Sequence, residues 1–411
     1  MINKRFYILA LLGLFIAIAA TAAAERSPGH ARLPGNVRQP LEVRVFEGGK
    51  FVDDLGLKDI ELFESDVPAI PEALFLVRRG QIERREGAAD VRPDLSRRLS
   101  LLFQLNEYSN KIREAIEYFF TNELMPGDTL EIQTPVRNYR LSAQHLAAKP
   151  RNILAEELTK IVRKDIMQGN AAYNSLLREL KTVVRLITWA GHGEVSDSEG
   201  EINSDTPLEV QLTNYRQNLQ EMEVMRSMTD ANLAAYASKL RALPGQKFVF
   251  IFYQREFRPE LDSNILAGMM RSYQDRPDIM ADLQSIFPLY QRSTTLNYAK
   301  LRQLFADSLA NVNFLFMNKQ SERVLGITMR EQSEDVFKAL STIAEATGGI
   351  VDSSQNPAAS IKTAAKAADS YYLLFYTPVV SVPPGTFLDL KVKVKGQNYK
   401  VVHSAGHFSR S

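Results

Sequence analysis

Two apolar runs in this chain each end in a glutamine. Leu99–Phe103 is followed by Gln104, and Phe248–Tyr253 is followed by Gln254. Both runs have the composition of buried parallel strands. In open α/β sheets, ligands gather beyond the carboxyl ends of such strands. Neutral amides stand there in this chain, where a metal or catalytic site would require carboxylates. The pattern therefore favours a binding or structural protein over an enzyme.

The middle of the chain alternates between predicted strands and predicted helices. The strand at 99–103 precedes a helical pattern, and further strands are expected at 129–133, 248–253 and 312–316. This alternation predicts an α/β fold with a doubly wound, mostly parallel sheet over residues 97–352. Helical stretches interrupt it at about 165–245 and 258–296, and we interpret them as insertions.

The two flanks of this region have the period of β-strands. Residues 25–40 are rich in Pro, Gly and Arg and are expected to form a linker. Residues 41–96 and residues 353–411 contain alternating apolar and polar positions, most clearly at Phe387–Val394. We therefore expect an N-terminal β segment, a central α/β region and a C-terminal β segment.

Residues 1–24 have the features of a secretory signal peptide. Lys4 and Arg5 precede an apolar stretch, and Ala22–Ala24 supplies the small residues of a cleavage site. The mature protein is then periplasmic or extracellular, without a stable membrane span; the alternative is an uncleaved leader that anchors it to the inner membrane. The chain has no cysteine, so disulfides and thiolate metal sites are excluded. Its 50 basic and 48 acidic residues give no reason to expect a nucleic-acid partner.

Several passages together resemble one known family. They are Phe51–Glu64, Arg98–Phe103 with Met125–Asp128, Leu340–Gly349, and Tyr371–Pro378 with Leu390–Val394. Their order and spacing are similar to those of the bacterial exported family called VWFA-related, which contains a von Willebrand factor type A domain. The resemblance covers about residues 41–408.

This resemblance implies a type A domain over 97–352, and a β-sandwich-like module in which 353–411 pairs with 41–96. Such domains commonly hold Mg²⁺ through an Asp-x-Ser-x-Ser pattern after the first strand and a second Asp after a later one. This chain has Gln104, Asn106 and Tyr108 at the first place and Gln254 at the second. No Thr counterpart is evident in 143–153. Because Mg²⁺ prefers carboxylate and water oxygens, we expect a degenerate site with no metal and no cofactor.

Three other features of the sequence are candidates for a catalytic or metal site. Gly191–Gly193, with His192 at its centre, faintly resembles the general-base segment of caspase-like proteases, but the chain has no Cys nucleophile. We predict a turn there. The acidic segment 194–205 lacks the Gly and distal Glu of a calcium loop and is interpreted as a loop. His403 and His407 have a spacing that suits a metal on a helix, whereas the pattern around them is that of a strand.

The leading hypothesis is an exported, non-catalytic protein-interaction module. Its partner-binding rim would be formed by four residues, which are Gln104, Asn106, Tyr108 and Gln254. One alternative is a divalent-metal-dependent adhesion protein with substituted ligands. A second alternative is a hydrolase within 165–296 that uses the His192 region. The sequence does not identify the partner.

Overall fold

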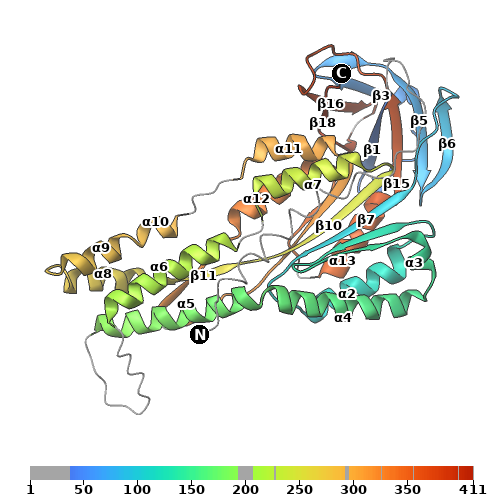
Figure 1. Cartoon of the computed structure of the whole chain (residues 1–411). Coiled ribbons are helices and arrows are strands. Elements are labelled where there is room, and N and C mark those ends of the chain that lie inside the picture. Colours follow the sequence, from blue (N-terminus) through green and yellow to red (C-terminus); the bar gives the residue numbers. More distant parts are fainter. Residues whose placement is uncertain are drawn as a thin grey trace.

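The computed structural model describes residues 38–192, 207–225, 228–291, 296–324, 326–354, 356–396 and 398–410. The predicted signal peptide and the acidic segment 194–205 lie outside these residues. Figure 1 shows three parts, which we call the body, the β module and the arm. The body is a sheet covered by helices, the β module lies at one end of that sheet, and the arm extends from the other end.

The body is built on a six-stranded sheet with the order β14-β12-β10-β7-β8-β9. The strands are β7 (Arg97–Gln104), β8 (Thr129–Gln133), β9 (Asn138–Leu141), β10 (Gln246–Gln254), β12 (Ala310–Met317) and β14 (Val351–Asp352). Every neighbouring pair is parallel except the edge pair β8 and β9. The central strands are buried along nearly their whole length, which explains why their sequences are continuous apolar runs.

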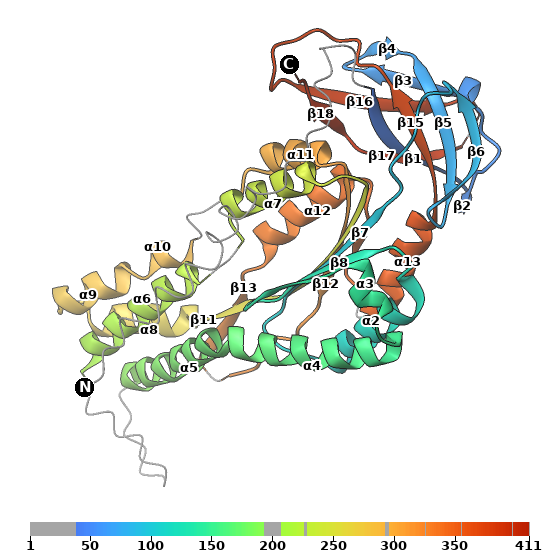
Figure 2. The ribbon, with the colours of Figure 1, turned by 45° about the vertical axis from the view of Figure 1, so that its right-hand side comes forward.

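Helices cover both faces of this sheet (Figure 2). Leu101 and Phe103 pack toward one face, and Leu102 between them packs toward the other, as the pleat of a strand requires. The first face carries α2 (Asn110–Tyr118), η3 (Phe119–Glu123), α3 (Ala143–Ala147), α4 (Arg151–Gly169) and α13 (Pro357–Asp369). The second carries α7 (Asp230–Ala242), α11 (Tyr298–Asp307) and α12 (Glu334–Ala346). The predicted mixed α/β class with parallel strands is therefore confirmed.

The arm has an apolar core of its own, in which Leu180, Leu212 and Leu283 are fully buried. Its elements are α5 (Ala171–His192), α6 (Leu208–Val224), β11 (Phe257–Leu261), α8 (Ser263–Ser272), α9 (Pro277–Gln284), α10 (Phe287–Tyr290) and β13 (Ile327–Glu331). The prediction of a wholly helical stretch at 258–296 is wrong at its start, because β11 pairs with β13 about seventy residues later. The predicted turn at 191–193 is also wrong at its first two residues, since α5 continues through His192, and Gly193 lies outside the described residues.

The β module is formed by strands from residues 39–87 and from residues 370–408. Its first sheet has the order β17-β1-β15-β5-β6, with β2 beside β1, and its second has the order β18-β16-β3-β4. The strands are β1 (Gln39–Glu47), β2 (Lys50–Phe51), β3 (Ile60–Glu64), β4 (Val67–Ala69), β5 (Pro71–Arg78), β6 (Gln81–Gly87), β15 (Ser370–Tyr376), β16 (Phe387–Val394), β17 (Lys400–His403) and β18 (Gly406–Phe408), with a short helix η2 (Leu57–Asp59). One apolar cluster joins both sheets, so residues distant in sequence share a core.

Candidate functional site

The arm is attached at the carboxyl edge of the body sheet. β10 ends at Gln254 and the chain continues into β11 of the arm, while β12 ends at Met317 and leads toward β13 (Figure 1). We call residues 104–107, 254–255 and 317–320 the rim. The four residues predicted to form a partner-binding surface include three that lie on the rim, namely Gln104, Asn106 and Gln254.

The Gln254 side chain holds the loop that follows β7. Its Oε1 accepts hydrogen bonds from the backbone N–H groups of Asn106 and Glu107, each at 2.9 Å. On the other side of the same loop, Asn170 Nδ2 donates to the Leu105 carbonyl oxygen at 2.6 Å. Asn170 joins α4 to α5, so the rim loop is bound both to the sheet and to the base of the arm.

The other predicted rim residues have different environments. Gln104 is the last residue of β7 and lies opposite Tyr253 in the register with β10. Tyr108 packs against the core beneath α4, and its hydroxyl is buried. That burial raises the pKa of Tyr108. Its hydroxyl therefore does not contribute to a surface at the rim, in contrast to the expectation from the sequence.

Charged side chains complete the rim. Lys319, just after β12, places Nζ 2.5 Å from Glu107 Oε1. Lys181 on α5 reaches Glu322 Oε2 at 2.5 Å, and Arg255 Nε lies 3.2 Å from Glu331 Oε1. Lys319 and Asn170 were not predicted from the sequence. The position of Lys319 after a predicted parallel strand was a usable signal, because carboxyl ends of such strands meet at one edge.

A small cleft lies between the rim and the arm. Its rim side is polar, with Asn106, Lys319, Gln320 and Glu322. Its arm side is largely apolar and is formed by Tyr173, Leu177, Phe257 and Met329. Arg255 lies where the chain crosses from one side to the other. Clefts between two packed units are common places for ligands and partners.

Polar groups around Gln254 and Glu107 already have partners within the protein. Both N–H groups of the rim loop already point at Gln254 Oε1, and the Lys319 ammonium lies beside the nearest carboxylate, Glu107. Among the residues that the structure describes, no three His, Cys, Asp or Glu side chains are grouped to hold a metal ion. His403 and His407 do not converge, because His407 Nε2 lies 3.0 Å from Glu64 Oε1 while His403 Nδ1 lies 2.7 Å from the Ser404 carbonyl oxygen. The side chain of His192 is not among those described.

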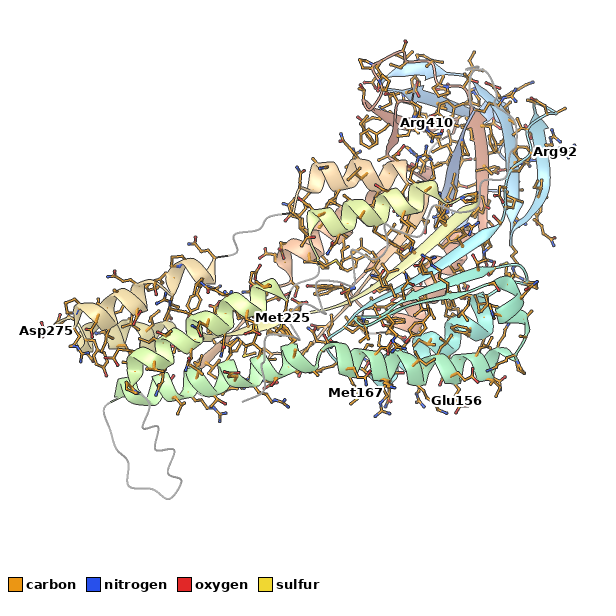
Figure 3. The ribbon with its side chains drawn as sticks, viewed as in Figure 1. Arg92, Glu156, Met167, Met225, Asp275 and Arg410 are labelled. Atoms are coloured by element: carbon orange, nitrogen blue, oxygen red, sulfur yellow. The ribbon has the colours of Figure 1, made fainter. Side chains whose placement is uncertain are left out.

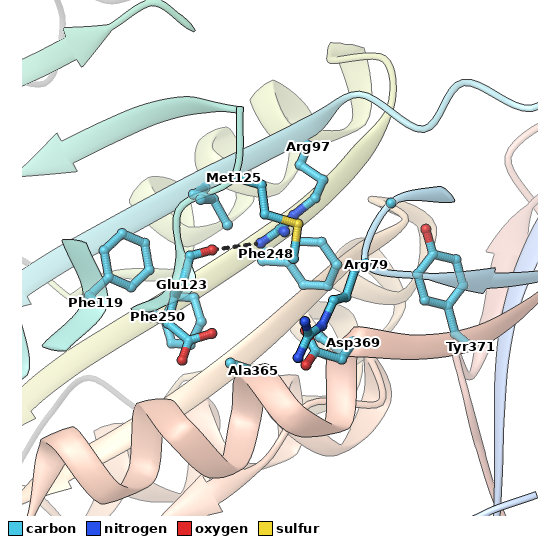
Figure 4. A pocket seen from close by; sticks show the side chains of 13 residues that line it. Arg79, Arg97, Phe119, Glu123, Met125, Phe248, Phe250, Ala365, Asp369 and Tyr371 are labelled. Atoms are coloured by element: carbon cyan, nitrogen blue, oxygen red, sulfur yellow. Dashed lines mark hydrogen bonds between the residues drawn. The ribbon is translucent and has the colours of Figure 1, made fainter. Parts of the chain in front are cut away.

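A second hollow lies at the opposite end of the sheet, between the body and the β module (Figure 4). Arg97 donates from Nη2 to the Glu123 carbonyl oxygen at 3.3 Å and lies over the ring of Phe248. Burial raises the pKa of the Glu123 carboxyl and of the Asp369 carboxyl, and Arg79 and Arg97 offset only part of that effect. The charges here are partly compensated and favour no particular ligand.

Replacing Asp369 tests whether burial raises the pKa of its carboxyl group. Its folded-state pKa is raised above the ordinary 3.8, so the stability it contributes is present below that value and is lost as pH rises through the folded pKa. Asp369→Asn keeps the side chain uncharged. We expect a higher melting temperature than wild type at neutral pH, with the difference shrinking as pH falls toward 3.8. Asp275→Asn, at the exposed tip of the arm, is the control and should leave melting unchanged (Figure 3). A lower melting temperature for Asp369→Asn at neutral pH would contradict the argument.

Comparisons with known proteins leave the chain without an assigned relative. No family model matches it, and no curated protein matches it. Among solved structures, the human COPII-coat protein Sec24c is similar at a TM-score of 0.27 and 8% identity, over 77% of this chain and 44% of that chain. The chain thus spans less than half of Sec24c, and a similarity this low supports no statement about fold or function. Within the described residues, no helix combines the length and apolarity needed to cross a bilayer.

Proposed function

We propose that this chain is an exported, non-catalytic protein-interaction module whose body is a von Willebrand type A-like domain without a working metal site. Numbered along the body, the strand order is 3-2-1-4-5-6, which is a doubly wound order. The one antiparallel strand, β9, lies at the edge, and helices cover both faces. These features support the resemblance seen in the sequence.

The single observation that carries the functional proposal is the hydrogen bonding of Gln254. A metal ligand must direct a lone pair at the ion, whereas both backbone contacts of Gln254 Oε1 are N–H donors within the rim. The rim is thereby a pre-formed surface made of the protein's own groups. Its remaining polar atoms and the apolar wall of the cleft are the combination that protein partners use.

Site-specific crosslinking tests where the partner binds. A photo-crosslinking amino acid is placed at Tyr173 in the cleft or, as a control, at the exposed Arg92 of the β module. Each purified protein is incubated with the envelope fraction of its native cell and irradiated. We expect the same protein to crosslink from position 173 in repeated preparations and to be absent from position 92. Equal crosslinking from both positions would contradict a partner site at the cleft.

Removing the Gln254 amide should weaken binding of the partner at the cleft. Gln254→Ala deletes the acceptor of two hydrogen bonds, so the rim loop loses its fixed shape. We expect a loss of at most about 1–3 kcal/mol of unfolding free energy, because two hydrogen bonds of roughly 0.5–1.5 kcal/mol each are removed and their part-buried and exposed donors can turn to water. The crosslink from position 173 should fall with it. Gln284→Ala, exposed on α9, is the matched control and should change neither quantity. Undiminished crosslinking in Gln254→Ala would show that the rim loop does not shape the site.

A further inference from the structure

The outer face of α4 and α5 is strongly basic. From residue 160 to residue 185 the exposed charged side chains are five basic ones and a single acidic one, Glu179. The basic ones are Lys160, Arg163, Lys164, Arg178 and Arg185. With Glu179 included, the exposed side chains of 160–185 carry a net charge of +4, although Glu156 and Glu157 are exposed earlier on α4. Positive charge is therefore concentrated on this face, which we call the basic stripe.

The stripe is continuous although two helices form it. Asn170 N–H donates to the Ile166 carbonyl, and Asn174 N–H donates to the Asn170 carbonyl, so helical hydrogen bonding passes across the joint. Arg178 and Arg185 are seven residues apart and share one side of α5. Figures 1 and 2 show α4 and α5 end to end along one long edge of the molecule. The stripe is roughly 40 Å long at 1.5 Å per residue.

Most of these cations have no ion-pair partner among the described residues. Lys160 pairs with Glu156 one turn away. For Arg163, Lys164, Arg178 and Arg185, no side-chain ion pair or hydrogen bond is formed with any residue that the structure describes. Maintaining four uncompensated charges on one face opposes folding slightly, so a stripe of this kind fits an anionic surface better than bulk water.

Apolar side chains lie on the same face. Met167 is 60% exposed and lies on the outward side of α4 (Figure 3), and Ile153 on the same helix is 40% exposed. A bilayer surface accepts both kinds of side chain at once, since lysine and arginine contact the headgroups while apolar groups enter the boundary below them. The basic residues of the stripe line neither of the two hollows described above.

We propose that the basic stripe of α4 and α5 docks the protein on the anionic surface of a lipid bilayer. The cleft at the rim involves other residues of α5, Tyr173 and Leu177. Docking by the stripe therefore leaves the cleft accessible, and the proposal is independent of the function proposed for the rim.

Vesicle sedimentation of the purified full chain tests the proposal. We expect binding to vesicles of equal parts phosphatidylglycerol and phosphatidylcholine, and little binding to phosphatidylcholine alone. Binding to the anionic vesicles should be lost at about 1 M salt, where the Debye length is about 3 Å. Reversal to Glu at Arg163, Lys164, Arg178 and Arg185 should weaken it at least about a hundredfold, since each basic residue near such a surface contributes about fivefold.

Two further variants separate docking from misfolding. Arg163→Gln with Lys164→Gln removes two charges without reversing them and should weaken binding about 25-fold. Charge reversal at four exposed basic residues outside the stripe is the matched control and should leave most of the binding intact; these residues are Arg92, Arg271, Lys362 and Arg410. Equal losses in the stripe and control variants would overturn the proposal. So would wild-type protein that ignores anionic vesicles but binds polyglutamate, which would identify an acidic protein instead.

Discussion

Gly349→Ala is expected to leave little folded protein. A Cβ at this position would lie 1.9 Å from the Val312 carbonyl oxygen and 2.6 Å from its carbon. Val312 is fully buried on β12, which is paired on one side with β10 and on the other with β14. The backbone has no room to withdraw. We expect a loss above about 4 kcal/mol, a large share of the 5–15 kcal/mol that holds a typical domain together.

Polar contacts around this glycine make the strain harder to relieve. Asn311 Nδ2 donates to the Gly348 carbonyl oxygen at 2.9 Å, and Asn313 Oδ1 accepts from the Ile350 N–H at 3.2 Å. The segment after α12 is thus fixed to β12 on both sides of Gly349. The soluble yield and the urea midpoint measure the effect. A midpoint equal to that of wild type would contradict the close approach.

Gly268→Ala is the control for the same chemical change. Gly268 lies inside α8, and no atom comes within 4 Å of a Cβ added there. Alanine is preferred over glycine in a helix by about 1 kcal/mol. We therefore expect this variant to be at least as stable as wild type, opposite in sign to Gly349→Ala.

Glu260→Ala is expected to unfold the arm. Glu260 Oε1 lies 2.7 Å from Arg258 Nη2, and both side chains are only 5% exposed. Removing the carboxylate leaves the Arg258 guanidinium buried and uncompensated, at a cost of about 3–5 kcal/mol. Arg258 also donates to the carbonyl oxygens of Leu289 and Tyr290, so it joins β11 to α10. Hydrogen exchange should show the loss in the arm before the body.

A double-mutant cycle isolates the pair. Arg258→Met with Glu260→Met should cost less than the sum of the single replacements, because no buried charge of the pair is then left alone, and Arg330, which also contacts Glu260, is 62% exposed. Glu156→Ala breaks the exposed pair with Lys160 and should cost under about 1 kcal/mol. If Glu260→Ala were as mild as Glu156→Ala, the pair would not be buried as the structure has it.

Strands with a clear apolar pattern could be predicted from the sequence. The strands expected at 248–253 and 312–316 are the cores of β10 and β12, and the alternation at Phe387–Val394 is that of β16. β6 and β13 escaped prediction because their residues are mostly polar and exposed, so no apolar period marks them. β11 was taken for helix because its partner β13 lies far away in the chain.

The residues of the candidate site could also be predicted only in part. Gln254 was predicted from its place after a buried strand, and it contacts the rim loop. Tyr108 was predicted beside it, but a residue entering a helix can face either the rim or the core, and this one faces the core. Asn170 could not be found from the sequence, because its role depends on how α4 and α5 meet the loop after β7.

Titration calorimetry with Mg²⁺, and then with Mn²⁺, tests most directly whether the rim is held by the protein's own hydrogen bonds. We expect no saturable heat for the wild-type chain, because Gln254 Oε1 is engaged by two N–H groups and Lys319 lies beside the nearest carboxylate. Saturable binding of either ion with micromolar affinity, abolished in Gln254→Ala, would contradict it.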